Sequence, residues 1–219
     1  GLVAFLPSND LNDIFLHYFD ERVEFRRDSD FTAERLTGLT PIEYSLEAGE
    51  PGGVAKPKFL AEVEAFAEWY RAQPETVHVN TITDIMKRLN RNMHGDDEGA
   101  YALPSERNLA AQYLLFYEMS LPYGLDLNNQ INIDKSATRM TASLRTLSTN
   151  ELLALEGRVQ EWLSSNAPTI TAGVGSGTAL MFAHIGKRNI ISMLIGTTVA
   201  LVLISLTLIL ALRSLRMGA

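Results

Sequence analysis

The residues of this sequence that are best suited to chemistry form one acidic cluster. His94, Asp96, Asp97 and Glu98 place an imidazole and three carboxylates within five positions. Such side chains can hold a divalent cation, but a loop that binds one spaces its oxygen ligands so that they converge on the ion. Consecutive acidic residues lack that spacing, so the sequence favours a solvated acidic loop over a metal site.

A glycine-rich stretch at 173–178, GVGSGT, has the general look of a phosphate-binding loop. A Walker A loop also needs a lysine that reaches the phosphates and a helix that opens on them. This stretch contains no lysine, and it leads into an apolar segment. We therefore interpret it as a flexible hinge.

No other group of side chains forms a recognisable catalytic pattern. The chain has no cysteine, which excludes a thiol nucleophile, a disulfide framework and a thiolate zinc site. The remaining histidines, His17, His78 and His184, stand alone in the sequence. Burial explains Trp69 and Trp162 better than stacking on a ligand does. The sequence predicts no enzyme activity, catalytic residue, metal site or cofactor, and it assigns no substrate-lining residue.

The charge of the chain is divided unevenly along its length. Of 219 residues, 19 are basic and 26 are acidic, for a net charge of −7. Residues 187–219 hold four basic side chains and no acidic one, so residues 1–186 carry 15 basic against 26 acidic side chains, a net charge of −11. An acidic domain of this kind is repelled by a phosphate backbone, so nucleic acid is not an expected partner.

The segment 190–212 predicts a transmembrane helix. It has 23 consecutive uncharged residues, of which 17 are Ile, Leu, Val, Met or Ala. As a helix it is about 35 Å long, enough to cross a hydrocarbon core of about 30 Å. Lys187 and Arg188 at one end, and Arg213 and Arg216 at the other, suit the two headgroup regions. Because the span contains no ionisable side chain, it cannot carry proton coupling alone.

Two strand–helix–strand units precede the span. In the first, residues 40–47 alternate apolar and polar side chains, as a half-buried strand does. Residues 57–73 then repeat apolar side chains at helical spacing, Pro74 ends that helix, and residues 76–82 alternate again.

The second unit begins with the alternating strand 136–147. Ser148 and Glu151 then have the spacing of a capping box, which predicts a helix that starts there and runs to residue 166. A short strand at 169–172 completes the unit. Two such units, each too small to bury its own apolar face, predict an α+β fold: a ferredoxin-like split β-α-β sandwich followed by one transmembrane helix.

The sequence therefore divides into three parts. Residues 1–39 are a helical lead-in, residues 40–186 are the α+β domain, and residues 187–219 contain the membrane helix. The first seven residues include no Met and no basic signal-peptide region, so we expect the chain to begin inside a longer protein.

The domain carries an insertion at 83–132, and the lead-in also has helical patterns. Helices are expected at 84–93 and 104–117 in the insertion, and at 9–19 and 28–36 in the lead-in. The insertion is rich in aromatic residues, which favours binding or subunit contact. A helix that caps the open sheet is an equally good interpretation.

The order of these elements and several short strings resemble one superfamily of membrane transporters. The exit from the span, 211–216, and five regions upstream of it carry the resemblance: 9–13, 18–21 with 25–28, 78–81, 93–97 and 123–130. The chain is similar to the resistance-nodulation-division (RND) superfamily, in the branch of hydrophobe and lipid exporters related to the mycobacterial large membrane proteins (MMPL).

This resemblance implies a fragment of a multi-pass transporter in the bacterial inner membrane, driven by proton antiport. The resemblance implies that residues 1–186 are an extracytoplasmic (periplasmic) porter domain, that of the second half of the transporter, and that the span is the next membrane helix. The implied partners are the lipid bilayer, the other membrane helices, the second porter domain, further copies in an oligomer and a hydrophobic small-molecule or lipid substrate.

Two other functions stay open from the sequence. A single-pass, membrane-anchored sensor or interaction module would have the same domain and span. A protein-translocation accessory subunit of the same superfamily would share the architecture as well.

Overall fold

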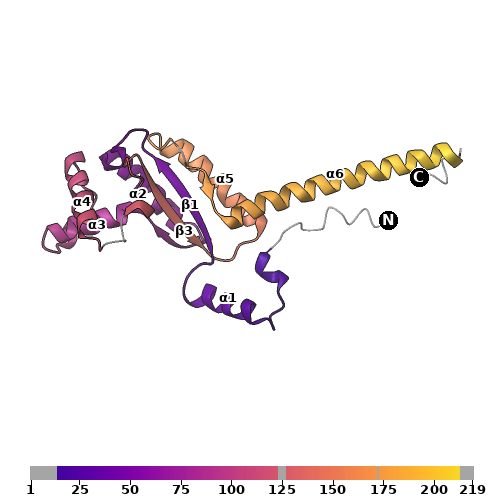
Figure 1. The fold of residues 1–219 in the computed structure, drawn as a ribbon, viewed down its shortest axis with the longest axis horizontal. Helices are drawn as coiled ribbons and strands as arrows, with labels where there is room; N and C mark the ends of the chain where they lie inside the picture. Colours follow the sequence, from indigo (N-terminus) through magenta and orange to yellow (C-terminus); the bar gives the residue numbers. More distant parts are fainter. Residues whose placement is uncertain (1–13, 123–126, 172, 213–219) are drawn as a thin grey trace.

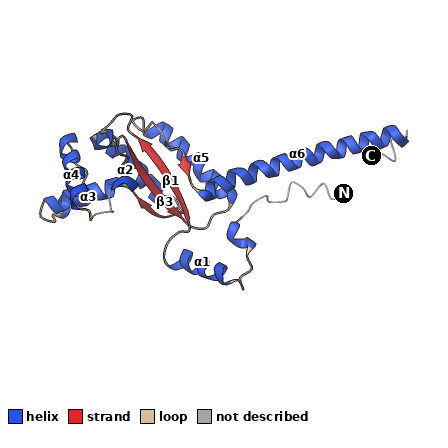
Figure 2. Ribbon diagram, in the orientation of Figure 1, coloured by secondary structure: helices blue, strands red, loops and turns tan. Residues whose placement is uncertain are grey.

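The computed structural model describes residues 14–122, 127–171 and 173–212. They form an α+β domain, from one end of which a single long helix, α6 (Thr178–Leu212), projects (Figure 1, Figure 2). The fold class predicted from the sequence is confirmed.

Four strands form one antiparallel sheet in the order β2-β3-β1-β4. Their bounds are β1 (Thr40–Glu47), β2 (Thr76–Asn80), β3 (Ala137–Leu144) and β4 (Gly175–Ser176). Because β1 and β2 both run antiparallel to β3, they are parallel to each other with β3 between them. This is the strand order of a split β-α-β sandwich.

The two faces of the sheet differ in polarity, as the alternation in the sequence predicts. In β1, Ile42, Tyr44 and Leu46 are buried, whereas Glu43 and Ser45 lie on the opposite, polar face. Two helices, α2 (Pro57–Arg71) and α5 (Thr149–Asn166), cover the apolar face (Figure 1). The sheet thus has one buried, apolar face and one solvent-exposed, polar face.

Aromatic side chains fill the space between α2, α5 and the sheet. The ring of Trp162 in α5 stacks on Phe66 and Trp69 of α2, with centroids 5.5 and 5.7 Å apart. The hydroxyls of Tyr44 and Tyr70 lie 3.1 Å apart within the core. Burial raises the pKa of both phenols, that of Tyr70 to about 12, so both stay protonated at neutral pH.

Helix α5 begins with the capping box that the sequence predicts. The Ser148 hydroxyl accepts a hydrogen bond from the backbone N–H of Glu151, and a Glu151 carboxylate oxygen accepts one from the backbone N–H of Ser148 at 2.9 Å. The reciprocal bonds satisfy two amide groups at the start of the helix. The predicted helix 148–166 is confirmed.

The insertion forms the end of the domain opposite to α6 (Figure 1). It contains α3 (Ile82–Met93) and α4 (Arg107–Ser120), which pack on each other. Met86 of α3 and Leu114 of α4 are fully buried in the same core as the sheet. The insertion is therefore part of the folded core, while the outer side of α4 exposes Leu115, Phe116 and Met119.

The fourth strand lies later in the sequence than we predicted. We expected it at 169–172, whereas it forms at Gly175–Ser176, inside the stretch that we interpreted as a hinge, and residue 172 lies outside the described residues. The backbone N–H of Thr169 donates to the carboxylate of Glu62 in α2 at 2.8 Å, and that of Thr171 donates to the carbonyl of Glu47 at the end of β1 at 3.0 Å, so this part of the chain bonds to both elements without forming a strand.

A glycine lies at a crowded position where β4 meets β1. Gly175 pairs with Tyr44, and a Cβ atom at Gly175 would lie 3.1 Å from the Tyr44 ring. The close approach explains why the edge strand falls on a glycine.

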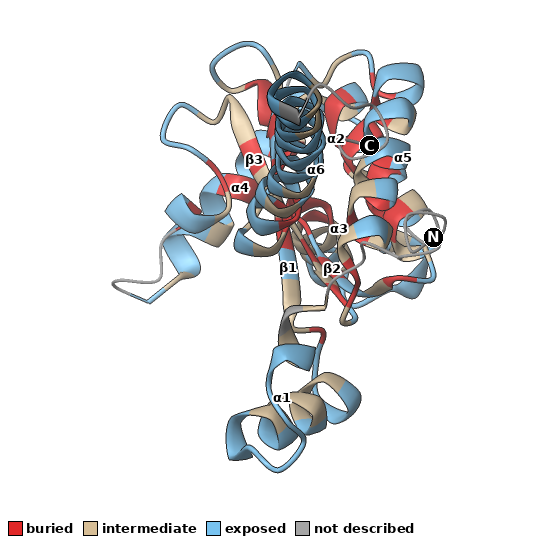
Figure 3. Cartoon of the chain, turned by 90° about the vertical axis from the view of Figure 1, so that its right-hand side faces the viewer, coloured by how far each residue is buried: buried red, intermediate tan, exposed pale blue. Residues whose placement is uncertain are grey.

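Helix α6 starts directly after β4 and runs without interruption through the boundary that we placed at 186–187. Its first turns pack on the domain through Leu180 and Ala183, and His184 lies 2.7 Å from Glu156 of α5. Thr178–Ala211 is the one described segment long and apolar enough to cross a membrane. Figure 3, which looks along α6, shows buried residues in the domain and the outer helix exposed.

The lead-in forms a 3₁₀ helix, η2 (Phe15–Tyr18), and helix α1 (Glu24–Arg35), which lies beside the domain with no buried residue (Figure 1). Of the helix expected at 9–19, residues 9–13 lie outside the described residues. The helix expected at 28–36 starts earlier than predicted.

Candidate functional site

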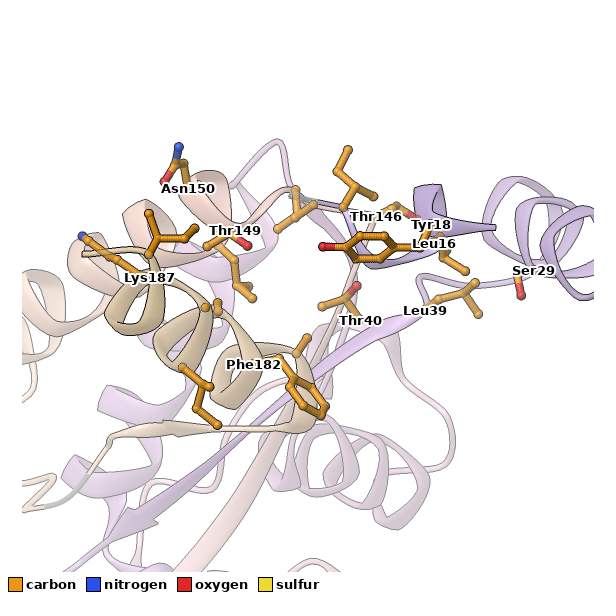
Figure 4. A pocket seen from close by; sticks show the side chains of 18 of the residues that line it. Leu16, Tyr18, Ser29, Leu39, Thr40, Thr146, Thr149, Asn150, Phe182 and Lys187 are labelled. Carbon is orange, nitrogen blue, oxygen red and sulfur yellow. The ribbon is translucent and has the colours of Figure 1, made fainter. Parts of the chain in front are cut away.

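A large pocket lies where α6 leaves the domain (Figure 4). It has a volume of about 750 Å³ and takes its walls from η2, α1, the start of β1, the loop between β3 and α5, the first turn of α5, and α6. A volume of this size is typical of small-molecule sites, which range over roughly 300–1,000 Å³. We treat it as the candidate functional site.

One face of α6 forms a long wall of the pocket. Its lining residues recur three or four positions apart, as residues on one helix face do. Most of them follow this spacing: Ala179, Phe182, Ala183, Gly186, Lys187 and Ile190, with Ile185 and Ile191 at the edges of this face. A Cβ atom at Gly186 would meet no atom within 4 Å, so the glycine leaves this wall open.

The opposite walls are held by hydrogen bonds outside the pocket. The capping box at Ser148 fixes the neighbouring residues Leu147, Thr149 and Asn150, which line the pocket. On the η2 side, the guanidinium of Arg26 donates to the backbone carbonyl of Leu16 at 3.0 Å. The same guanidinium pairs with Asp30 at 2.6 Å, which ties the η2 wall to α1.

The lining of the pocket is mainly apolar, and among its described residues Lys187 is the one that carries a formal charge. No acidic side chain from residues 14–122, 127–171 or 173–212 lines it. Within the described ranges, no carboxylate forms an ion pair with Lys187, whose side chain is exposed. In Figure 4, Lys187, Thr149 and Asn150 lie on one side of the cavity, with the polar ends of Lys187 and Asn150 directed away from its centre, and Phe182 lies on another side. The pocket therefore has a positive, hydrogen-bonding rim and an apolar interior.

The acidic loop at 94–98 makes local contacts only. Glu98 pairs with Arg91 at 3.1 Å, the ring of His94 bonds the backbone carbonyl of Asn90 at 2.8 Å, and Asp97 caps the next 3₁₀ turn. No cluster of three or more side chains suited to metal binding forms among residues 14–122, 127–171 and 173–212.

The three isolated histidines stay apart in the fold. His17 is exposed in η2, His78 is exposed on β2, and His184 contacts Glu156 at 2.7 Å between α6 and α5. None of them lines the pocket beside α6.

Charged side chains also meet between α2 and α3. Lys87 of α3 pairs with Glu64 of α2, and Arg71 of α2 pairs with Asp84 of α3 at 2.7 Å. Burial is the largest single influence on Glu64 and disfavours its charged form, but the bonds from Lys87 and Thr83 and the charges of Lys87 and Arg71 together outweigh burial and hold the pKa of Glu64 below its usual range. The same pair raises the pKa of Lys87 against the effect of burial. This cluster joins two helices and faces no pocket.

No sequence pattern identified the pocket, because separate segments contribute its walls. The available signal was the spacing of Gly186 and Lys187 just before the uncharged span at 190. A glycine and a cation at the start of a membrane helix are common enough that they do not identify a site without the neighbouring walls.

Comparison with known proteins does not identify a family. No protein-family model matches the sequence. No curated protein matches it at a significant level.

Proposed function

We propose that this chain is part of a proton-driven RND transporter of the MMPL type, which exports hydrophobic or amphipathic compounds such as lipids or drugs. Residues 1–186 then lie on the periplasmic side of the bacterial inner membrane and form part of the substrate pathway. The observation that carries this proposal is the pocket beside α6. The helix lines it both with residues packed on the domain and with the first residues of the proposed span.

The pocket gives an apolar compound a route out of the bilayer. Ile190 and Ile191, the first residues of the uncharged segment, line it together with Phe182 of the domain-packed turns. Each Å² of apolar surface exposed to water costs about 25 cal/mol. A continuous apolar wall therefore lowers the barrier for a lipid-soluble compound to move from the membrane into the domain.

The energy for transport would come from outside this chain. From Ile190 to Ala211, α6 carries no ionisable side chain, and proton relays in membranes use ionisable groups. The proposal therefore requires other membrane helices, a second porter domain and, in the family pattern, an oligomer.

Filling the pocket tests the proposal. Gly186→Leu adds a side chain at a position where a Cβ atom meets nothing, so the helix tolerates it while the pocket loses volume. We expect export of a fluorescent hydrophobic dye by the full-length transporter to fall about tenfold or more, with an unchanged amount of protein in the membrane.

The matched control is Gly157→Leu in α5, where a Cβ atom also meets nothing and the site is outside the pocket. It should leave export unchanged. Deletion of the insertion is a poorer test, because Met86 and Leu114 belong to the core. Normal export by Gly186→Leu would contradict a role of the pocket in transport.

The proposed location can be tested by labelling. Because these 219 residues contain no cysteine, Ser45→Cys on the exposed polar face of the sheet introduces the one thiol of this region, to be labelled in a transporter whose other cysteines are replaced. An impermeant maleimide should label it in cells whose outer membrane is permeabilised. Labelling only after the inner membrane is lysed would place the domain in the cytoplasm.

A membrane-anchored sensor is the second candidate, favoured by the unbroken α6, which would transmit movement between domain and membrane. The reading frame beyond residue 219 distinguishes the two. Several further apolar spans support a transporter, whether an exporter or a protein-translocation subunit, whereas a cytoplasmic signalling domain supports the sensor.

A further inference from the structure

We infer that the pocket beside α6 binds amphiphiles with one anionic headgroup, a carboxylate or a phosphate, which it takes from the bilayer and holds at Lys187. This inference rests on the proposed function, because it names the class of compound that the proposed pathway accepts. It is argued from the charge, the polarity and the position of the pocket.

The charge of the pocket favours an anion. Lys187 contributes the one formal charge of the described lining, and no carboxylate among the described lining residues competes with a ligand for its ammonium or favours a cationic ligand. Bonds between an ammonium and a carboxylate or phosphate are about twice as strong as bonds between neutral groups. A ligand anion can therefore complete the interactions of this side chain.

The polar groups lie together, as a headgroup site requires. Thr149 and Asn150, at the start of α5, lie on the same side of the cavity as Lys187 (Figure 4). The rest of the cavity is lined by side chains such as Phe182 and Leu152. One polar side and an apolar interior match a molecule with one polar end and an apolar chain.

The position of the pocket indicates the bilayer as the source. Ile190 follows Lys187 by three residues, or about one helical turn, and both line the pocket. With the headgroup at Lys187, an apolar chain can lie along the wall that continues into the span. A small water-soluble anion would leave this apolar volume unfilled.

Arg188 allows the pocket to be separated from general attraction to the membrane surface. It carries the same charge as Lys187 one position later, is exposed and does not line the pocket. Both side chains can reach lipid headgroups as flanking cations do. A ligand bound in the pocket lies beside Lys187 and not beside Arg188, so its binding should depend on Lys187 alone.

The experiment measures binding to the full chain in nanodiscs of zwitterionic lipid. The probe is a dansyl-labelled fatty acid, and its methyl ester is the uncharged counterpart. We expect Lys187→Gln to weaken binding of the acid about tenfold, Arg188→Gln to leave it unchanged and Lys187→Arg to restore it. The ester should bind the unaltered chain more weakly than the acid and should not respond to Lys187→Gln.

Three outcomes would overturn the inference. Equal losses in Lys187→Gln and Arg188→Gln would show attraction to the charged surface of the helix. Equal affinity for acid and ester would show a pocket without charge selection. Displacement of the probe by millimolar inorganic phosphate would show a site for a water-soluble anion.

The proposed function and this inference can fail separately. If the acid binds selectively but export by Gly186→Leu is normal, the ligand class stands and the transport role fails. If export requires an open pocket but Lys187→Gln binds acid and ester like the unaltered chain, the transport role stands and the ligand class fails.

Discussion

Glu64 and Lys87 pair in the space between α2 and α3, with Arg71 and Asp84 beside them. The pair and its neighbours are largely shielded from solvent, with 13% of the Lys87 side chain and 18% of the Glu64 side chain exposed. Because burial without a partner would favour the neutral acid, the lowered pKa of Glu64 reflects the ion pair. The pair therefore contributes to stability only while Glu64 is ionised.

The sign of this effect gives a prediction for acid stability. A carboxyl whose pKa is lower in the folded state stabilises the fold above its unfolded pKa, about 4.3 for Glu, and loses that contribution as pH falls through the folded pKa. We expect Glu64→Gln to be less stable than the unaltered chain at pH 7 by about 1–3 kcal/mol. The difference should shrink below pH ~4 in urea unfolding measured as a function of pH, and a constant difference would contradict the assignment.

Gly38 makes the tightest backbone approach in the domain. A Cβ atom there would lie 2.1 Å from the carbonyl oxygen of Leu144, closer than atoms can approach. We expect Gly38→Ala to lower the free energy of unfolding by about 1–3 kcal/mol or more, since the backbone of β3 must shift.

Gly157→Ala is the matched control for that substitution. Its Cβ atom meets nothing within 4 Å and it lies inside α5, so alanine should stabilise the helix by up to about 1 kcal/mol. Thermal melts of both variants measure the contrast. Equal stability of the two would show that the approach of Gly38 to Leu144 is looser than described.

At the scale of elements, the stability of α5 depends on its N-cap residue, Ser148. Ser148 is buried and bonds to the backbone N–H of Glu151. Ser148→Ala should cost about 1 kcal/mol in unfolding free energy. Ser165→Ala, at an exposed position in the last turn of the same helix, should change stability little. A similar loss in both variants would mean that the cap is not the cause.

Elements with a strong local signal could be predicted from the sequence. The alternation of Ile42, Tyr44 and Leu46 fixes β1 with its observed bounds, and the Ser148 cap fixes the start of α5. The two-residue strand β4 has no such signal, because pairing of Gly175 with Tyr44 depends on close approach in three dimensions. The pocket is beyond sequence patterns for the same reason, since its walls meet only in the fold.

At the scale of the whole molecule, the continuity of α6 can be measured. Spin labels at Met181 and Val202, both exposed and 21 residues apart, should be separated along the helix axis by about 32 Å. We expect double electron–electron resonance on the double-cysteine variant to give a narrow distance distribution in a membrane. Adding Ile185→Pro should broaden or shorten it. A broad distribution without the proline would show a break near the domain boundary.

If α6 crosses the bilayer as proposed, the unbroken helix also makes the domain sensitive to bilayer thickness. α6 is about 52 Å long by its 35 residues, and a membrane helix adjusts its tilt to the local hydrocarbon thickness. Gly186 and Lys187 belong to the same continuous helix as the span. A change of tilt therefore moves that wall of the pocket relative to η2 and α5. The lipid composition around the protein would thus set the width of the cavity, even without a ligand.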